Sequence, residues 1–219
     1  MGIARNIAVI GLGTFGGSVA RELTRLGDRV MGIDINAQTL ASFSNEFDLS
    51  IQADASDPKA LKECALDSYD AVIVSIGENL QASILTALNV LELGCTSIWV
   101  KAQNESHKKI LTSIGIENVV LPEQTQGKHI AQIVHNPRLS DFLILENEHY
   151  IATVPVTGRL LGTSLERNKV LEKYGLTCLG ISNKEGVETQ NLRAIDLSVH
   201  HTIILCGNRA HLRKFTDSL

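Results

Sequence analysis

The first 135 residues contain six short apolar runs, rich in Val and Ile, that alternate with stretches of a different pattern. Each run is too short for a helix, and the clearest ones are apolar at every position. Such runs are typical of strands that are buried on both faces of a parallel sheet. They lie at Ile7–Ile10, Val30–Ile33, Leu49–Ile51, Ala71–Ile76, Ile98–Val100 and Val119–Leu121.

The stretches between these runs carry helix signals. Val19, Leu23 and Leu26 form an apolar stripe at helical spacing. Pro58 stands where a helix after Asp57 would begin, and Gly94 stands where another would end. Repeated alternation of strand and helix implies right-handed crossovers. We therefore predict an α/β fold with a Rossmann-like, doubly wound parallel sheet of six strands.

The pattern changes after a helix predicted over Gln124–His135, which Asn136-Pro137 ends. Two strands, a helix, three strands and a last helix are expected beyond it, at Phe142–Leu145, Tyr150–Val156, Leu165–Tyr174, Thr177–Ser182, Val187–Gln190, Thr202–Cys206 and Ala210–Leu219. This order predicts a small α+β domain. The expected domains are residues 1–136 and residues 137–219.

Composition excludes several classes of protein. The 20 Lys and Arg are outnumbered by 24 Asp and Glu, which gives a net charge of −4, and only 4% of residues are aromatic. A nucleic-acid-binding protein usually has a basic face or stacking aromatics, so we expect no nucleic-acid partner. No apolar run approaches the ~20 residues that span a bilayer, and the four cysteines are scattered. We expect a cytoplasmic protein.

A glycine-rich motif, Gly11-Leu12-Gly13-Thr14-Phe15-Gly16, directly follows the first predicted strand and opens a helix. This is the context that a dinucleotide-type phosphate site requires. Gly11 permits a tight turn, Gly13 lets the backbone approach a pyrophosphate, and Gly16 lets the helix and strand pack closely. The N–H groups at the start of that helix would then receive phosphates. The alternative is a glycine-rich turn without a ligand.

Acidic and small residues follow the second, third and fourth strands. A carboxylate at Asp34 would accept hydrogen bonds from ribose hydroxyls and would disfavour a 2′-phosphate. Asp54 stands between Ala53 and Ala55, where small residues leave room for adenine and a polar group can read its amine. The alternative role for Asp54 is to cap the helix that begins at Pro58. Ile76-Gly77 could cover the adenine face.

Two charged residues follow the fifth and sixth strands, at the edge where open α/β sheets bind ligands. Lys101 could meet a phosphate. Glu123 could ligate Mg²⁺ or, alternatively, pair with a lysine. No acid or base stands out as the centre of a dehydrogenase, and no Gly-x-Ser-x-Gly turn is present. A nucleotide site without visible chemistry beside it favours a sensor over an enzyme.

The sequence resembles the RCK-type regulatory subunits of bacterial potassium uptake systems, and among them the KtrA group. The likeness covers nearly the whole chain. It is carried by the strings Ile10-Gly11-Leu12-Gly13-Thr14-Phe15-Gly16-Gly17-Ser18, Asp34-Ile35-Asn36, Ser75-Ile76-Gly77-Glu78-Asn79-Leu80-Gln81-Ala82-Ser83, Ile98-Trp99-Val100-Lys101-Ala102-Gln103-Asn104 and Pro122-Glu123. The C-terminal domain resembles the accompanying RCK_C (TrkA-C) module.

The resemblance implies a ring, typically an octamer built from dimers, docked beneath a KtrB-like, Na⁺-dependent K⁺-translocating subunit at the cytoplasmic face of the inner membrane. ATP and ADP would bind the Rossmann-like domain and favour different ring shapes. The implied nucleotide-binding residues extend the set above by Thr14, Phe15, Ile35 and Asn36. Glu123 would meet the terminal phosphate through Mg²⁺ or Ca²⁺, and Lys101 would be the phosphate's counter-charge.

The sequence departs from many relatives at Thr14, where they carry an arginine that reaches the terminal phosphate. Discrimination of ATP from ADP would then rest elsewhere. The basic and amide side chains expected of a cyclic di-AMP site near Lys169–Lys173 are incomplete, so that ligand is not predicted. Three alternatives remain: an NAD(H)-responsive TrkA-like regulator, an NAD-dependent oxidoreductase, and a metabolic binding module without a membrane partner.

Overall fold

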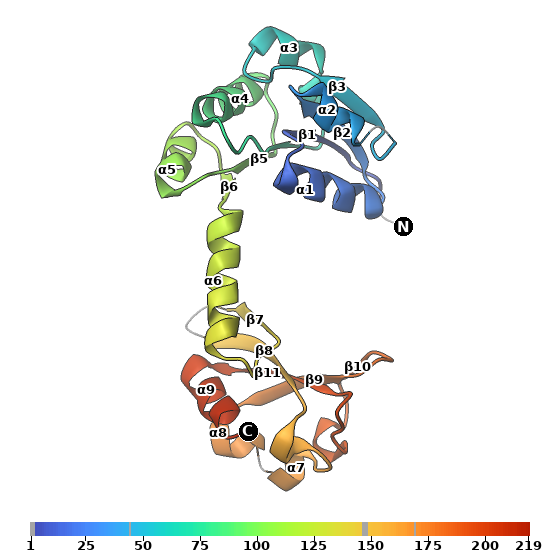
Figure 1. Ribbon diagram of the computed structural model, residues 1–219, viewed down its shortest axis with the longest axis vertical. Coiled ribbons are helices and arrows are strands. Elements are labelled where there is room, and N and C mark those ends of the chain that lie inside the picture. The colour runs from blue at the N-terminus through green and yellow to red at the C-terminus, as the bar shows by residue number, and fades with distance from the viewer. Residues whose placement is uncertain (1–2, 44, 146–148, 169) are drawn as a thin grey trace. The chain divides into compact units, whose positions relative to one another are not determined.

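A computed structural model describes residues 3–43, 45–145, 149–168 and 170–219 (Figure 1). The chain forms two compact units, of which unit 1 ends at Thr125 and unit 2 begins at Gln126. Helix α6 (Pro122–His135) contains the boundary between these units. The predicted domain boundary after residue 136 lies at the end of this helix and stays a prediction.

Unit 1 contains a six-stranded parallel sheet in the order β3-β2-β1-β4-β5-β6 (Figure 1). The strand order reverses direction beside β1, so the carboxyl ends of β1 and β4 flank the switch point where such sheets bind ligands. The predicted Rossmann-like sheet is confirmed. Its strands are β1 (Asn6–Ile10), β2 (Arg29–Asp34), β3 (Leu49–Gln52), β4 (Ala71–Val74), β5 (Ile98–Lys101) and β6 (Asn118–Val120).

Helices cover both faces of this sheet, because the central strand is apolar at successive positions. Ile7 and Val9 of β1 pack in one core cluster, while Ala8 and Ile10 pack in another. The first cluster includes residues of α1 (Thr14–Arg25) and α2 (Ala37–Ala41). The second includes residues of α3 (Pro58–Glu63), α4 (Leu80–Glu92) and α5 (Glu105–Ser113), and the short 3₁₀ turn η1 (Leu66–Ser68) also contributes.

Side-chain caps begin four of these helices in the part of unit 1 that the structure describes. In each case an Asn or Asp accepts a hydrogen bond from a backbone N–H of the first turn, which is a strong helix-start signal. The caps are Asn36 of α2, Asp57 of α3, Asn79 of α4 and Asn104 of α5. Helix α1 differs, since its N-cap residue is Gly13, which has no side chain to cap the helix.

Unit 2 is built around an antiparallel sheet in the order β10-β9-β11-β8-β7, as the predicted α+β pattern requires. Its core includes Val154, Ile203, Leu205 and Phe215, each almost fully buried. The elements are β7 (Asp141–Ile144), β8 (His149–Pro155), β9 (Thr177–Ser182), β10 (Val187–Glu188), β11 (Thr202–Asn208), η2 (Gly158–Leu160), α7 (Leu165–Asn168), α8 (Val170–Tyr174), η3 (Leu192–Ala194) and α9 (Arg209–Asp217). None of the helices formed by the described residues is long and apolar enough to cross a bilayer.

Several predicted elements differ in extent from the observed ones, most of them by one or two residues at an end. Strand β4 ends at Val74 and not at Ile76, because the chain turns there against the glycine-rich loop. Strand β10 ends at Glu188. The helix predicted over Leu165–Tyr174 is described as α7 and α8, and the residue between them lies outside the described part of the chain.

The interior of unit 1 holds one histidine. His107 of α5 is 1% exposed, and its Nδ1 accepts a hydrogen bond from the Gln103 backbone N–H at 3.2 Å. Its Nε2 is buried without a partner among the described residues. Desolvation penalises the charged imidazolium, so burial lowers the pKa of His107.

The lowered pKa of His107 predicts a loss of stability in mild acid. As pH falls below the usual histidine value of about 6.5, the unfolded chain binds a proton at this position that the folded chain excludes. The free energy of unfolding should therefore fall as pH drops from 7 to 5, by at most about 1.4 kcal/mol per pH unit for this group. His107→Asn keeps an acceptor for Gln103 but does not titrate.

Urea unfolding followed by circular dichroism between pH 5 and 7.5 measures this slope. The slope should become smaller in His107→Asn and stay unchanged in His200→Asn, since His200 is exposed. An unaltered slope in His107→Asn would contradict the prediction, whatever that variant's absolute stability.

Candidate functional site

The glycine-rich loop runs close to the ends of β2 and β4, the two strands that flank β1. Gly11 has a φ of +88°, a conformation that side chains disfavour. Its N–H donates to the Ile33 carbonyl at 2.8 Å, and a Cβ at Gly11 would lie 2.9 Å from the Ser75 carbonyl oxygen. The loop is therefore confined between the ends of β2 and β4, as the predicted tight turn requires.

The start of α1 is open to an anion. A Cβ at Gly16 would lie 1.9 Å from the Gly11 carbonyl oxygen, so the helix begins directly against the loop. A Cβ at Gly13 would meet nothing within 4 Å, which leaves the space above the helix start clear. The first turn contains no acidic residue, and Gly13 supplies no cap. Its first N–H groups and the positive end of the helix dipole can receive a phosphate.

Asp34 braces the loop from the end of β2. One carboxylate oxygen accepts the Leu12 backbone N–H at 2.8 Å, and the other accepts the Asn36 N–H at 2.8 Å. A carboxylate offers about four lone-pair sites, so two bonds leave capacity for ribose hydroxyls. The structure thus shows Asp34 to be a positioning residue for the loop, and its ribose contact stays a prediction.

The two residues after Asp34 have different surroundings. Asn36 caps α2, because its side chain accepts the Gln38 N–H at 2.8 Å. Ile35 is 64% exposed. Its carbonyl accepts a hydrogen bond from Gln52 Nε2. Ile35 can offer an apolar surface to a ligand, whereas the Asn36 side chain already serves the helix.

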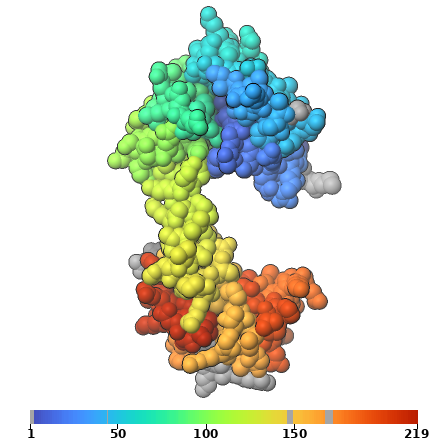
Figure 2. Space-filling view, viewed as in Figure 1, coloured from blue at the N-terminus to red at the C-terminus, as the bar shows by residue number. Residues whose placement is uncertain are grey.

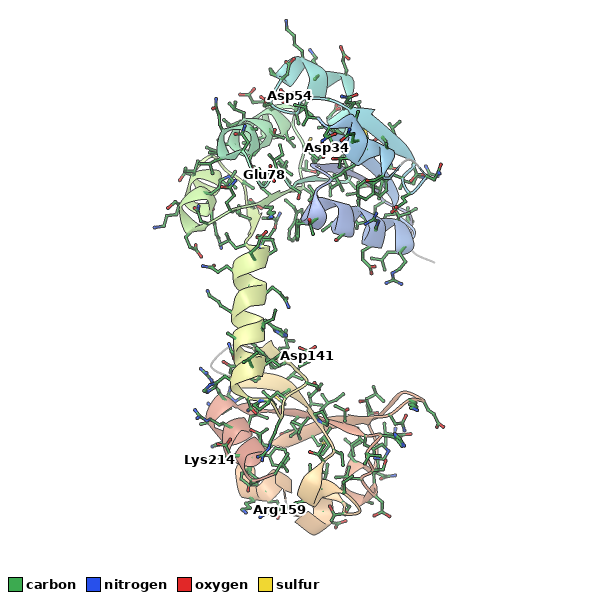
Figure 3. The ribbon with its side chains drawn as sticks, viewed as in Figure 1. Asp34, Asp54, Glu78, Asp141, Arg159 and Lys214 are labelled. Carbon is green, nitrogen blue, oxygen red and sulfur yellow. The ribbon has the colours of Figure 1, made fainter. Side chains whose placement is uncertain are left out.

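The three residues predicted to lie near adenine, Ala53, Asp54 and Ala55, have different surroundings. The Asp54 carboxylate accepts both the backbone N–H and the hydroxyl of Ser56, and these bonds lower the pKa of Asp54. The capping role considered for Asp54 belongs to Asp57, which accepts the Lys59 N–H. Ala55 is buried in the core, while Ala53 is only partly buried. In Figure 3, Asp34, Asp54 and Glu78 lie at the edge where β2, β3 and β4 end.

Lys101 is the point where three elements of the site converge. Its side chain is only 13% exposed, and its Nζ lies 2.5 Å from Glu123 Oε1 in the first turn of α6. The same Nζ lies 5.7 Å from the centroid of the Phe15 ring, in the first turn of α1. The ammonium group of Lys101 lowers the pKa of Glu123. The structure thus brings together the predicted phosphate counter-charge, the helix start and the predicted metal ligand.

Gly77 and Ile76 complete the boundary of the site beside Lys101. A Cβ at Gly77 would lie 3.6 Å from Lys101 Nζ, and the Gly77 carbonyl accepts a hydrogen bond from Gln103 Nε2. Ile76 is partly buried against the core. No cluster of three or more His, Cys, Asp or Glu suited to a metal occurs in the described part of the chain.

Sequence reasoning missed Ser75 and Gln103 as site residues. Ser75 is 6% exposed, its N–H donates to the Ile10 carbonyl at 2.7 Å, and its carbonyl confines Gly11. Gln103 ties the loop after β5 to the loop after β4. Both residues stand in strings that carry the family resemblance, but no spacing rule separates a small residue and an amide just after strand ends from an ordinary loop.

The glycines of the loop predict two distinct mutant outcomes. Gly16→Ala forces a Cβ onto the Gly11 backbone, and such overpacking costs about 1–3 kcal/mol or more. Gly13→Ala meets no atom within 4 Å and has an ordinary φ of −64°. We expect chemical denaturation to show a large loss of stability in Gly16→Ala and a change of less than about 0.5 kcal/mol in Gly13→Ala. Equal losses in both variants would contradict the packing described here.

Comparisons with known proteins agree with this geometry. The TrkA-N domain model matches residues 7–122. Ktr system potassium uptake protein C of Bacillus subtilis (strain 168) is 35% identical over 96% of this chain and 96% of its own length. Ktr system potassium uptake protein A of the same organism is 33% identical over 97% of this chain and 96% of its own length.

Solved structures share the fold. The crystal structure of the GsuK RCK domain matches with a TM-score of 0.68 at 17% identity, over 96% of this chain and 46% of that chain. The GsuK channel bound to NAD matches with a TM-score of 0.66 at 16% identity, over 96% of this chain and 38% of that chain. GsuK bound to ADP matches with a TM-score of 0.50 at 17% identity, over 57% of this chain and 33% of that chain.

The sequence-based resemblance is thereby confirmed for the TrkA-N region and for the Ktr relatives. The RCK_C assignment of unit 2 is not part of the family match, which ends at residue 122. The chain belongs to the TrkA-N domain family and, within it, to the KtrA-type proteins of Ktr potassium uptake systems.

Proposed function

We propose that this chain is a regulatory subunit that senses ATP and ADP and gates a KtrB-like K⁺-translocating membrane subunit. The observation that carries the proposal is the uncapped start of α1, with the Lys101 ammonium beside Phe15 in its first turn. Backbone N–H groups and one cation at a helix start form a phosphate site.

The residues present fit an adenine nucleotide. Phosphates would lie at the N–H groups of Gly13–Gly16, where a Cβ at Gly13 meets nothing. The ribose would meet the free lone pairs of Asp34, and the adenine would lie near Ala53, Asp54, Ile76 and Gly77, with Ile35 offering apolar surface. Thr14 contributes a hydroxyl where an arginine would contribute charge.

The Lys101–Glu123 ion pair gives the proposed site a means to respond to phosphate. A terminal phosphate at Lys101 competes with the Glu123 carboxylate for the same ammonium group. A ligand shifts an equilibrium only by its differential affinity for two states. With Mg²⁺ or Ca²⁺ present, the released Glu123 would become a ligand of the ion together with phosphate oxygens. ATP and ADP would then differ in how fully they displace Glu123.

A TrkA-like response to NAD(H) is the second candidate, because GsuK has been solved with NAD and with ADP. Asp34 does not separate the two, since both ligands carry an adenosine ribose. We propose further that the protein is not an enzyme, which its relationship to potassium uptake proteins supports. An NAD-dependent oxidoreductase would instead show turnover with small alcohols or keto acids.

We also propose that the chain works as a homo-oligomer, with dimers forming an octameric ring, held at the cytoplasmic face of the membrane through its transporter partner. Exposed apolar side chains on α6 support a partner surface. Ile130 is 51% exposed and Val134, one turn later, is 74% exposed. Large apolar side chains on one helix face favour protein contact.

A calorimetric titration of the full chain with ATP, ADP, NADH and NAD⁺ tests the ligand class. We expect tight binding of ATP and ADP with weaker binding of both dinucleotides. Asp34→Ala should weaken the binding of every adenosine ligand by roughly 1.5–3 kcal/mol, which is the usual contribution of a hydrogen bond to a charged group. Because Asp34 also braces Leu12, Asp34→Asn is the companion variant that retains one acceptor oxygen.

The relative affinities for ATP, ADP, NADH and NAD⁺ decide which ligand class the protein senses. Selective binding of NADH or NAD⁺ would move the proposal to the redox-responsive regulator. Unchanged affinity in both Asp34 variants would remove the ribose contact. Failure of all four ligands to bind would overturn nucleotide sensing altogether.

Glu123→Gln separates the ion-pair role from the metal role. In EDTA the variant should bind ADP as tightly as the wild type or more tightly, because a competitor for Lys101 has lost its charge. In Mg²⁺ or Ca²⁺ it should lose ATP affinity several-fold, because a carboxylate ligand is missing.

Glu78→Gln is the matched control, an exposed acid at the same edge of the sheet that makes neither contact. Its affinities should equal the wild type's in both buffers. If Glu123→Gln loses nucleotide affinity equally in EDTA and in Mg²⁺, the result would contradict both the ion-pair role and the metal role.

A further inference from the structure

A cavity of about 90 Å³ lies within unit 2, bounded by the last turn of α6, strands β7 and β8, and helix α9. A water molecule needs about 10–15 Å³ of such space, so the cavity can hold several waters or a small organic molecule. The end of α6 and α9 are joined beside it, since Asn136 Nδ2 donates to Thr216 Oγ1 at 2.9 Å. Figure 2 shows the atoms of these two elements side by side.

The inner wall of the cavity is apolar and held in place. Phe142, Ala152 and Leu212 line it, with exposed fractions of 9%, 0% and 3%. The Phe142 ring stacks on His129 at 4.5 Å between centroids and lies tilted against Tyr150 at 6.0 Å. A ring fixed from two sides offers a preformed flat surface, which lowers the ordering cost for a ligand ring.

The rim of the cavity carries an excess of positive charge. Arg209 and Arg213 are one turn apart on α9, and both line the cavity. Among the lining residues that the structure describes, Asp217 is the one carboxylate, and it lies 3.8 Å from Arg213 Nε. Arg209 also stands at the start of α9, where the helix dipole adds positive potential. Arg213 thus has a carboxylate neighbour, whereas Arg209 makes no ion pair with another described residue, so a guanidinium fork is free for an anionic group.

We infer that this cavity binds a small aromatic acid, whose ring lies against Phe142 and Leu212 and whose carboxylate or phosphate group meets Arg209 and Arg213. A fixed apolar wall with a few convergent polar groups is the usual composition of a small-molecule site. The ligand would touch both α6 and α9, and would add to the Asn136–Thr216 link between them. Its binding therefore stabilises unit 2.

Titration of the full chain with benzoate and with phenyl phosphate, observed by NMR, tests the site and distinguishes the two anionic groups. Benzyl alcohol is the uncharged probe of the same size. Either anion should bind saturably with a dissociation constant on the order of 1 mM, as expected for a molecule of so few atoms. The better anion should bind at least tenfold tighter than benzyl alcohol and should raise the thermal midpoint of unit 2.

Variants on α9 locate the binding. Arg213→Gln and Arg209→Gln should each weaken the better anion at least fivefold. Lys214→Gln is the matched control, because Lys214 is the neighbour of Arg213 on α9 and does not line the cavity (Figure 3). It should bind the probe as the wild type does. All three side chains are exposed, so these variants should fold.

Four results would overturn the inference. The first is that neither anion binds saturably, and the second is that benzyl alcohol binds as tightly as the better anion. The third is that Lys214→Gln loses as much affinity for the probe as Arg213→Gln does, and the fourth is that ADP competes with the probe for binding. The last result would place the probe at the glycine-rich loop of unit 1. Loss of nucleotide binding in unit 1 would leave this test unaffected, because the cavity lies wholly in unit 2.

Discussion

The backbone of α1 approaches the loop that precedes it so closely that no side chain fits between them. A Cβ at Gly16 would overlap the Gly11 carbonyl, and a Cβ at Gly11 would crowd Ser75. This contact places the first N–H groups of α1 at the switch point between β1 and β4. Because backbone meets backbone, the position of the helix start does not depend on flexible side chains. The remaining site residues are arranged around it.

Asp34 holds this arrangement together with charge. Its carboxylate joins the Leu12 N–H of the loop to the Asn36 N–H before α2. Hydrogen bonds to an ionised acceptor are stronger than neutral ones. The loop is consequently fixed by the same residue to which the proposed function assigns the ribose, so a ligand would have less of the loop left to order.

Much of unit 1 could be predicted from the sequence because its strands are buried on both faces, which leaves continuous Val and Ile runs. The helix start at Pro58 and the helix end at Gly94 were predicted from local chemistry, and both are present in the structure. The end of β4 was misjudged because Ile76 is apolar, whereas the close approach of Ser75 to Gly11 turns the chain first. That contact joins residues far apart in sequence, and no local pattern contains it.

The site was harder to predict than the fold because residue type does not show whether a polar group is already engaged. Asp54 and Asp57 are the same residue type three positions apart, yet one bonds Ser56 in a turn and the other caps α3. Glu123 had two candidate roles, and the structure contains its ion pair with Lys101. The choice depended on where β5 and α6 meet, which is a tertiary property.

Lys101 explains how such a site can be both preformed and responsive. An ammonium group that is only 13% exposed needs a counter-charge, and Glu123 supplies it. A phosphate can therefore replace Glu123 at Lys101 only if it binds the site more strongly than the Glu123 carboxylate does. In the proposed function, α1 would supply this difference, because its uncapped N–H groups can bond further oxygens of the same phosphate. In the proposed function, the missing cap on α1 would let a phosphate outcompete Glu123, and a side-chain cap at Gly13 would remove that advantage.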